Sequence, residues 1–348
     1  MDIKLTSFAH GGGCGCKIAP SVLEQILQGS AATSHEKLIV GNSTRDDAAV
    51  FDIGNGMGMI STTDFFTPIV DDPFIFGQVA AANAISDVYA MGGEPSMALA
   101  VLGWPVEKID ISHAARVLEG AREKCAEAGI PLAGGHSIDT QEPVFGLCVS
   151  GLVKLDELKR NDTAKEGDLL LLTKPLGIGV LSAALKRAVI EDAHYEVLKE
   201  NITSLNKVGA LLGKVHGVNA LTDITGFGLL GHLIEMCEGS GLSAELGYSS
   251  ILQLDGVGGY ISQRVVPDAT YRNWNSYSAK VSFQKGVNVM EAFSLLPDPQ
   301  TNGGLLVSVS PSAVSEVEEI LRSCGLNRYT KPVGVMQARQ EKTVQVVI

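Results

Sequence analysis

The first half of the chain shows both strand-like and helix-like spacing of its apolar residues. Short apolar or alternating runs are typical of strands, and they occur at residues 38–40, 48–52, 57–62, 96–102 and 144–153. Apolar positions three and four residues apart are typical of amphipathic helices, and they occur at residues 20–28, 76–91 and 112–128. The order of these segments predicts an α/β or α+β domain with at least one mixed sheet.

A charged segment at residues 154–168 separates these elements from a second group. Such a composition shift is typical of a domain boundary, so we predict one domain over residues 21–155 and another over residues 168–348. In the second domain, apolar runs predict strands at residues 169–173, 220–224, 305–308 and 344–348. Helical spacing predicts helices at residues 180–189, 202–215 and 313–324, and another that follows residue 228 and ends near residue 237. Residues 254–285 show only weak hydrophobic periodicity, so we predict no helix or strand there.

Composition narrows the class of protein and of partner. The chain has 348 residues, of which 39 are glycine and 5% are aromatic, which suits a sheet-containing enzyme with many tight turns better than a helix bundle. Its net charge is −12, and it has no run of basic residues, so nucleic acid and anionic membranes are not expected partners. An acidic protein binds an anionic substrate through metal ions or backbone dipoles. Because no apolar segment has signal-peptide or membrane-span length, we expect a cytoplasmic protein.

The most reactive segment is predicted at the N-terminus. Three glycines at residues 11–13 precede the sequence Cys-Gly-Cys-Lys at residues 14–17. Glycine-rich segments lose much entropy on ordering and bury little surface, so we predict that residues 1–20 form a mobile arm that closes over a site elsewhere. A thiolate beside a lysine ammonium has a lowered pKa, which predicts a reactive Cys14 next to Lys17. The alternative is a flexible terminus whose cysteines have no function.

Acidic residues stand at the ends of several predicted elements. On the predicted helix at residues 76–91, Asn83 and Asp87 are one turn apart and border the apolar face. The other acids flank predicted strands, and each segment alone also fits an ordinary turn. Carboxylates that gather in one place need cations between them. The acids concerned are Asp46, Asp47, Asp64, Asp87 and Asp223.

A glycine pair supplies a candidate phosphate cradle. In the sequence Gly-Gly-His-Ser at residues 134–137, we predict a glycine turn whose successive amides cradle a phosphate. A structural histidine in an ordinary turn is the alternative. The Walker sequence and the protein-kinase motifs are absent. Together with the acids, Arg45 and Lys17, this turn predicts a polyphosphate held through divalent cations, with Mg²⁺ the expected ion because it bridges carboxylates and phosphate oxygens.

These segments, in this order, resemble the motifs of the selenophosphate synthetase (selenide, water dikinase) family. The resemblance covers nearly the whole chain, through residues 10–17, 41–50, 61–66, 83–87, 91–93, 132–137, 172–177, 222–228 and 298–301. The cysteine and lysine of the arm distinguish this family from relatives of the same fold, such as aminoimidazole ribonucleotide synthetase and thiamine monophosphate kinase. One departure is Asn302, where the family pattern leads us to expect serine.

The resemblance implies a two-domain fold of the aminoimidazole ribonucleotide synthetase superfamily, with mixed sheets and a flexible N-terminal arm. It also implies a homodimer whose N-terminal domains pair, with ATP near their interface. The implied reaction converts ATP, selenide and water to selenophosphate, AMP and phosphate, and so supplies selenium for selenocysteine and selenouridine. A selenium-delivery protein is a further partner that the family allows.

The resemblance assigns roles to individual residues as well. It makes Cys14 the essential thiol, which we expect to hold or deliver the selenium atom, and it places Lys17 at the phosphates. It implies that Mg²⁺ is held by Asp47, Asp87 and Asp223. It implies nucleotide contacts for Lys17, Thr44, Arg45, Asp46, Asp64, Asp87, Gly135, His136 and Ser137.

Two other functions fit parts of the pattern. A non-catalytic carrier of selenium or of a metal would use Cys14 and Cys16 as ligands, but it leaves the nucleotide-binding segments unexplained. A different ATP-using enzyme of the same fold would explain those segments, but it has no need of Cys14 and Lys17. A zinc site is weaker still, because Cys-x-Cys supplies only two ligands.

Overall fold

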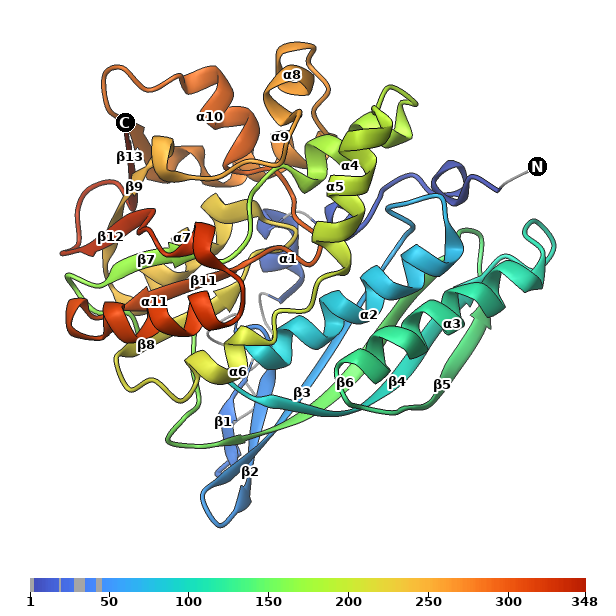
Figure 1. Ribbon diagram of the computed structural model, residues 1–348, viewed down its shortest axis with the longest axis horizontal. Helices are drawn as coiled ribbons and strands as arrows, with labels where there is room; N and C mark the ends of the chain where they lie inside the picture. The colour runs from blue at the N-terminus through green and yellow to red at the C-terminus, as the bar shows by residue number, and fades with distance from the viewer. Residues whose placement is uncertain (1–2, 19, 28–34, 42–45) are drawn as a thin grey trace.

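The computed structural model describes residues 3–18, 20–27, 35–41 and 46–348. Two layered units follow one another along these residues, each built on one mixed sheet. Figure 1 shows the first unit, coloured from blue to green, beside the second unit, coloured from light green through yellow to red. The mixed sheets confirm the predicted fold class.

The first sheet contains six strands in the described part of the chain. Its strands β4 and β5 are parallel, and its other neighbouring pairs are antiparallel. Buried and exposed residues alternate along most of β3, as expected for a sheet with one packed face and one open face. In spatial order the strands are β1 (Leu38–Val40), β2 (Ala49–Gly54), β3 (Met57–Phe66), β6 (Val144–Lys154), β4 (Glu94–Trp104) and β5 (Leu132–Asp139).

Two long helices, α2 (Pro73–Ala90) and α3 (Ile111–Glu127), cover one face of this sheet (Figure 1). Helix α2 begins where the Asp72 carboxylate accepts hydrogen bonds from the backbone N–H groups of Phe74 and Ile75, which satisfies donors left free by the first turn. From Phe76 to Ala90 every residue of α2 is buried. The cause is its position, because α2 packs against the sheet, against α3 and against helices of the second unit.

The second sheet contains seven strands among the described residues. Parallel pairs join β10 to β13 and β13 to β9, and the remaining pairs are antiparallel. Central strands such as β11 are buried along their whole length. In spatial order the strands are β10 (Val281–Phe283), β13 (Val344–Val347), β9 (Ser243–Gly247), β12 (Gly334–Gln337), β7 (Leu169–Leu172), β11 (Leu305–Val309) and β8 (Val218–Asp223).

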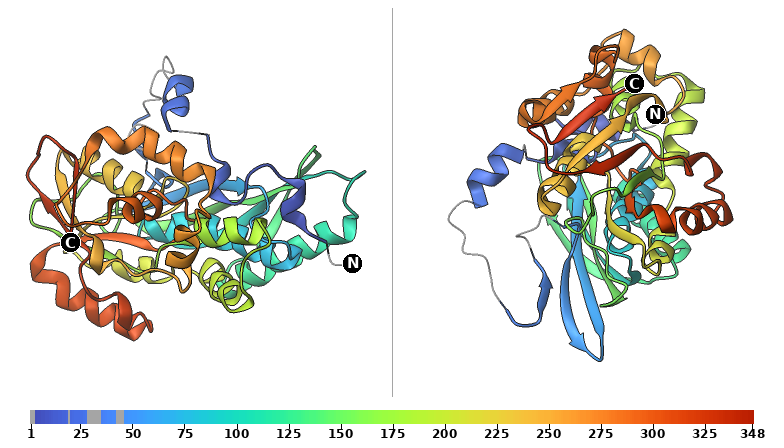
Figure 2. Two further views of the ribbon diagram at one scale, coloured as in Figure 1. Left: turned by 90° about the horizontal axis from the view of Figure 1, so that it is seen from above. Right: turned by 90° about the vertical axis from the view of Figure 1, so that its left-hand side faces the viewer.

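Helices of the second unit surround this sheet, and Figure 2 shows from two further sides how they stack against the first unit. None of the helices in the described ranges has the length and hydropathy that crossing a bilayer requires. They are α4 (Ile178–Lys186), α5 (Asp192–Thr203), α6 (Val208–Leu212), α7 (Gly228–Ser240), α8 (Val257–Ser262), α9 (Asp268–Tyr277), α10 (Val289–Leu295) and α11 (Val314–Ser323), while α1 (Pro20–Leu27) follows the arm.

Three sequence-based assignments need correction. Residues 134–137, predicted as a turn, lie inside strand β5. The single helix predicted over residues 202–215 is two elements, the end of α5 and the short helix α6, with residues 204–207 between them. Residues 254–285, which received no element, contain α8, α9 and β10.

Candidate active site

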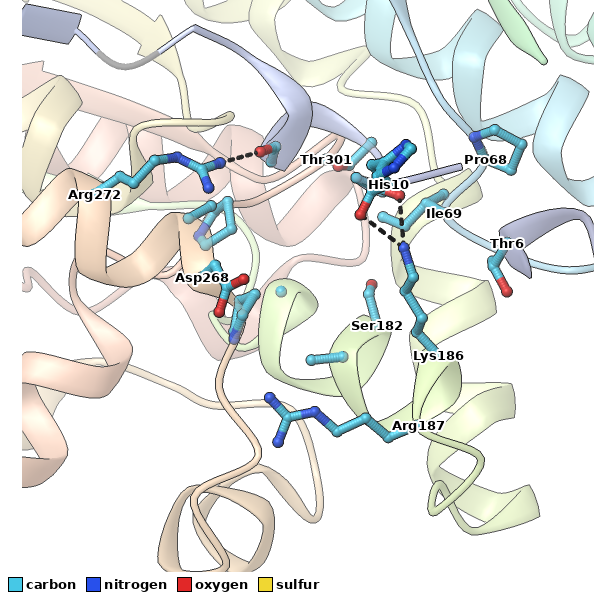
Figure 3. A pocket seen from close by; sticks show the side chains of 18 residues that line it. Thr6, His10, Pro68, Ile69, Ser182, Lys186, Arg187, Asp268, Arg272 and Thr301 are labelled. Carbon is cyan, nitrogen blue, oxygen red and sulfur yellow. Dashed lines mark hydrogen bonds between the residues drawn. The ribbon is translucent and has the colours of Figure 1, made fainter. Parts of the chain in front are cut away.

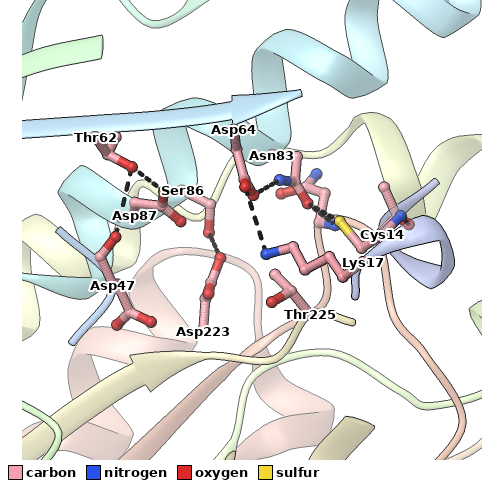
Figure 4. A network of polar contacts seen from close by, with 12 residues as sticks. Cys14, Lys17, Asp47, Thr62, Asp64, Asn83, Ser86, Asp87, Asp223 and Thr225 are labelled. Carbon is pink, nitrogen blue, oxygen red and sulfur yellow. Dashed lines mark hydrogen bonds and ion pairs between the residues drawn. The ribbon is translucent and has the colours of Figure 1, made fainter. Parts of the chain in front are cut away.

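Four aspartates that are far apart in sequence meet where the two units face each other (Figure 4). The first unit supplies Asp47, just before β2, Asp64, near the end of β3, and Asp87, in the last turn of α2. The second unit supplies Asp223, the last residue of β8. The structure therefore brings together all three predicted metal ligands, and the predicted nucleotide contact Asp64 lies beside them.

Hydroxyl groups hold three of these carboxylates in place. Thr62 Oγ1 donates to Asp87 Oδ2 over 2.5 Å, and Thr222 Oγ1 donates to Asp47 Oδ1 over 2.9 Å. In addition, Ser86 Oγ donates to Asp223 Oδ2 over 2.6 Å and accepts from Asn206 Nδ2 over 2.8 Å. Sequence reasoning assigned no role to these donors, although Thr62, Ser86 and Thr222 lie inside the segments that carry the resemblance.

The acidic cluster is electrostatically strained by its own charges. Burial raises the pKa of Asp47 well above its usual range, and the charges of Asp223 and Asp46 raise it further. Burial also raises the pKa of Asp87, with added repulsion from Asp64 and Asp223. The pKa of Asp223 is raised to about 6 by burial, against the hydrogen bond from Ser86. Such shifts indicate carboxylates that need a cation in order to ionise together.

One oxygen of this cluster, Asp47 Oδ2, is buried and has no hydrogen-bond partner among the residues that the structure describes. An unpaired buried carboxylate oxygen costs free energy, and a hard cation would relieve that cost. Within the described ranges, no three His, Cys, Asp or Glu side chains are already grouped to hold a metal ion. The donor set suits Mg²⁺ nonetheless, because Mg²⁺ usually takes one or two carboxylates and completes its shell with water and phosphate oxygens.

Lys17 reaches this cluster from the arm. Its Nζ lies 3.4 Å from Asp64 Oδ1, and its side chain is 36% exposed. Burial lowers the pKa of Lys17, but the charges of Asp64, Cys14, Asp87 and Asp223 outweigh that effect and raise it above its usual value. The ammonium is therefore charged over the physiological pH range, at the border between the acids and solvent.

Cys14 is fully buried in the structure, which corrects one prediction. We predicted that Lys17 lowers the pKa of this thiol, but burial raises the pKa well above its usual value, and Lys17 offsets only part of that increase. Its Sγ donates to Asn83 Oδ1 over 3.3 Å, and its backbone N–H donates to Thr301 Oγ1 over 2.9 Å. With the arm in this position, Cys14 is a protonated thiol rather than an exposed thiolate.

Asn83 links the thiol to the acidic cluster. Its Oδ1 also accepts a 2.7 Å bond from the backbone N–H of Asn302, and its Nδ2 donates to Asp64 Oδ2 over 2.6 Å. Since a backbone N–H only donates, the amide must turn its oxygen toward Asn302 and thus toward Cys14. A single buried side chain on α2 therefore fixes both Cys14 and the partner of Lys17.

Three of the remaining predicted nucleotide contacts are not tested by this geometry. Thr44 and Arg45 lie outside the described residues. Asp46 is described, and its Oδ1 accepts a 2.8 Å hydrogen bond from the backbone N–H of Asn161 in the segment between the two units.

Gly135, His136 and Ser137, predicted to contact the nucleotide, have a different backbone conformation from the one expected. These residues lie on the edge strand β5 and not in a turn. The strand register aligns Asp64, Leu147, Ala100 and Gly135 in one row across the sheet, and three strand spacings amount to about 14 Å. Any nucleotide contact here would involve a part of the nucleotide other than the part beside Asp64.

Comparison with protein families divides the chain at the segment between the two sheets. The model of the AIR synthase related protein N-terminal domain matches residues 45–153, and that of the AIR synthase related protein C-terminal domain matches residues 165–347. Among solved structures, the hydrogenase maturation protein HypE in complex with ATP has a TM-score of 0.66, with 17% identity over 99% of this chain and 94% of its own. The thiamine-monophosphate kinase from Stenotrophomonas maltophilia has a TM-score of 0.63, with 16% identity over 95% of this chain and 96% of its own. These likenesses show the fold.

Curated relatives are far more similar in sequence. The selenide, water dikinase of Aeromonas hydrophila is 52% identical over 339 residues, which cover 97% of this chain and 96% of the relative. That of Colwellia psychrerythraea is 51% identical over 347 residues, which cover 99% of both chains. Identity of this level over nearly the whole length is what a shared family predicts.

Proposed function

The chain belongs to the selenide, water dikinase family, and from this premise we propose that the arm and the acidic cluster together form its active site. The enzyme uses ATP and selenide to make selenophosphate, with AMP and phosphate as the other products. The observation that carries the assignment of the site is the position of Cys14 and Lys17, which the arm brings to the four aspartates.

In this proposal Asp47, Asp87 and Asp223 hold Mg²⁺. The mutual repulsion of the three carboxylates and the unpartnered Asp47 Oδ2 support the assignment. Bound there, Mg²⁺ would neutralise phosphate oxygens that the acidic protein would otherwise repel. The hydroxyls of Thr62, Ser86 and Thr222 keep the carboxylate oxygens oriented toward one another before the nucleotide arrives.

Lys17 binds phosphate oxygens in this scheme. Its present partner is Asp64, and at 3.4 Å this ion pair is longer than a charge-assisted hydrogen bond, so a phosphate oxygen can take the place of the carboxylate. Because the ammonium stays charged, it stabilises negative charge on the transferring phosphoryl group, where electrostatics supply most of the rate acceleration. The arm that carries Lys17 also excludes water, and this limits wasteful hydrolysis.

Cys14 holds or delivers the selenium atom and does not accept phosphate. A buried, protonated thiol is a poor nucleophile toward phosphorus, whereas hydroselenide is already ionised near neutral pH. The thiol lies beside Lys17 and Asn83, so selenium held near Cys14 would be close to the phosphate that Lys17 binds.

We also place the enzyme in the cytoplasm, where the six cysteines, all free in the structure, stay reduced.

The enzyme is proposed to act as a homodimer through the open face of the first sheet. Apolar side chains on that face are strongly exposed, Phe65 at 52% and Ile138 at 59%, and His136 is exposed beside them. An apolar face of this extent is typical of a surface that a protein partner covers. The other exposed apolar residues of the face are Met59, Met97, Leu99 and Leu152.

The deciding experiment is anaerobic phosphorus NMR of the protein with ATP, Mg²⁺ and selenide, run in parallel on Cys14→Ser. We expect a selenophosphate resonance together with AMP and phosphate from the wild type, and no selenophosphate from the variant. ATP consumption without a phosphorus–selenium product would indicate a different ATP-using enzyme. The absence of any turnover would indicate a selenium carrier. Selenide uptake at full rate by Cys14→Ser would overturn the role of Cys14.

A further inference from the structure

A pocket of about 350 Å³ lies between the arm, helix α4 and the start of α9 (Figure 3). Arm residues His10, Gly11, Gly12 and Gly15 form one wall, and cationic side chains of the second unit form another. None of these cations belongs to the proposed site. Two of them, Lys186 and Arg272, bind the backbone of the arm.

Lys186, the last residue of α4, binds three consecutive peptide groups of the arm. Its Nζ donates to the backbone oxygen of Ala9 at 2.7 Å. It also donates to those of His10 at 2.9 Å and Gly11 at 3.2 Å (Figure 3). An ammonium group has three N–H donors, so the arm uses all of them. Three carbonyl groups that converge on one cation fix the path of the backbone where the run of glycines begins.

Arg272, on helix α9, binds the arm on the other side of Cys14. Its guanidinium donates to the backbone oxygen of Gly15 over 2.8 Å. Between the two attachments, the backbone N–H of Gly13 donates to Thr67 O over 3.0 Å. The segment that carries Cys14 is therefore held at residues 9–11 and at residue 15 by two cations of the second unit. From the first unit, Glu142 accepts hydrogen bonds from His10.

We propose that Lys186 and Arg272 form a latch that closes the arm and so positions Cys14 and Lys17 for the reaction. Both are positioning residues, since they touch the arm and not the reacting groups. Both side chains are exposed, and their acceptors are neutral carbonyl oxygens, which water can replace. The latch is thus suited to reversible closure, which would admit substrates and release products. This inference rests on the proposed role of the arm.

The test measures how fast iodoacetamide alkylates Cys14, by mass spectrometry with fragmentation that separates Cys14 from Cys16. The exposed Cys16 serves as an internal reference, and the buried Cys125 and Cys237 report whether a variant is folded. We expect Cys14 to react at least fivefold faster in Lys186→Met or Arg272→Met, and faster again in the double variant. Cys125 and Cys237 should stay protected, and Lys186→Arg should recover part of the wild-type protection.

Arg187→Met is the matched control. Arg187 lines the same pocket but donates to the backbone oxygens of Arg264 and Val266, not to the arm. If the latch acts through its arm contacts, this variant should alkylate within twofold of the wild type. If Arg187→Met accelerated Cys14 alkylation as much as Lys186→Met, the acceleration would come from the lost positive charge in the pocket and not from lost contacts with the arm. That result would overturn the latch.

Kinetics separate the latch from general loss of structure. We expect kcat/KM for selenide to fall at least fivefold in Lys186→Met, with partial rescue in Lys186→Arg. Unchanged Cys14 alkylation in the double variant, with Cys125 and Cys237 protected, would overturn the latch. So would a wild-type Cys14 that reacts as fast as Cys16. If the proposed function is wrong, the wild type will make no selenophosphate, even though Cys14 alkylation changes in the latch variants as expected.

Discussion

At the scale of single residues, Asn83 is the side chain on which the buried part of the site depends. It satisfies the backbone N–H of Asn302, the thiol of Cys14 and one oxygen of Asp64 at once. Each of these groups would be left without that partner if the amide were removed. Buried polar groups without partners are expensive, so Asn83 should contribute to stability as well as to activity.

We therefore expect Asn83→Ala to lower the free energy of unfolding by about 2–4 kcal/mol, the range for breaking a buried hydrogen-bond network. Urea unfolding monitored by circular dichroism would measure it. Asn288→Ala is a suitable comparison, because Asn288 caps the exposed start of α10 and loss of a cap costs about 1 kcal/mol. Equal losses in the two variants would contradict the role given to Asn83.

Lys174 gives a prediction of pH dependence. Burial lowers the pKa of this lysine from its usual value to about 7, and its Nζ donates to the backbone oxygens of Ser204 and Asn302. Between pH 7 and the usual lysine pKa, the unfolded chain binds more protons at this position than the folded chain. The contribution of Lys174 to stability should therefore rise with pH across that window.

The expected slope from this one group is at most about 1.4 kcal/mol per pH unit. Unfolding free energies of the wild type and Lys174→Met, measured from pH 7 to pH 9, should diverge in that direction as pH rises. Lys199→Met, at an exposed ion pair with Glu196, should keep the wild-type slope. Parallel curves for wild type and Lys174→Met would show that Lys174 is charged in the folded protein.

Some residues of the site could be predicted from the sequence and others could not. The acids, Cys14 and Lys17 could be identified because several acidic segments and one Cys-Gly-Cys-Lys segment occur together in one chain, in the order of a family's motifs. The hydroxyl donors could not be identified from the sequence, because a donor such as Thr222 is 175 residues from the carboxylate of Asp47 that it binds. Asn302, which departs from the expected serine, adopts a φ of 52°, a backbone region that asparagine tolerates better than most residues.

At the scale of elements, helices α2 and α3 approach each other through glycine. A Cβ added at Gly77 would lie 1.9 Å from the backbone oxygen of Val117, and one at Gly120 would lie 2.0 Å from that of Phe74. Backbone atoms at these distances cannot move aside alone, so the helices would have to separate. Since α2 carries Asn83, Ser86 and Asp87, this close approach also sets the position of the site.

Gly77→Ala should therefore destabilise the protein by several kcal/mol, on the order of the larger overpacking costs, and should reduce turnover. Thermal unfolding together with the phosphorus NMR assay would measure both effects. Gly258→Ala, in helix α8, is the matched control because its added Cβ meets nothing within 4 Å. That variant should be neutral or more stable by about 0.5–1 kcal/mol. A stable, active Gly77→Ala would contradict the packing argument.

Helices and strands with a long, regular apolar pattern were predicted correctly from the sequence, whereas short, polar or exposed elements were missed. The long helices α2 and α3 and the strands β3, β4 and β6 were predicted because their apolar spacing persists over many residues. Strand β5 was missed because it sits at a sheet edge, carries two glycines and has mostly exposed side chains. Helices α8 and α9 were missed because helix α8 is only six residues long and α9 is largely polar.

At the scale of the whole molecule, the open face of the first sheet predicts association. We expect the wild type to be a dimer by light scattering after gel filtration, and Leu99→Glu to shift it to monomer, because a charge cannot be buried there without a partner. Ile111→Glu is the matched control, since Ile111 is 68% exposed at the start of α3, on the helix layer of the same unit. A dimer that survives Leu99→Glu would place the interface elsewhere.

The long sequence separation of Cys14 from its partners has a consequence for protein synthesis. The backbone N–H of Cys14 donates to Thr301, 287 residues later, and Asn83, which accepts the hydrogen bond of the thiol, is itself held by the backbone N–H of Asn302. Ribosomes make the arm first, and contacts between distant segments form last. Every nascent chain therefore carries Cys14 without these partners until translation has passed residue 302. A chain that stops earlier would expose a reactive thiol to the cell and could not complete the site.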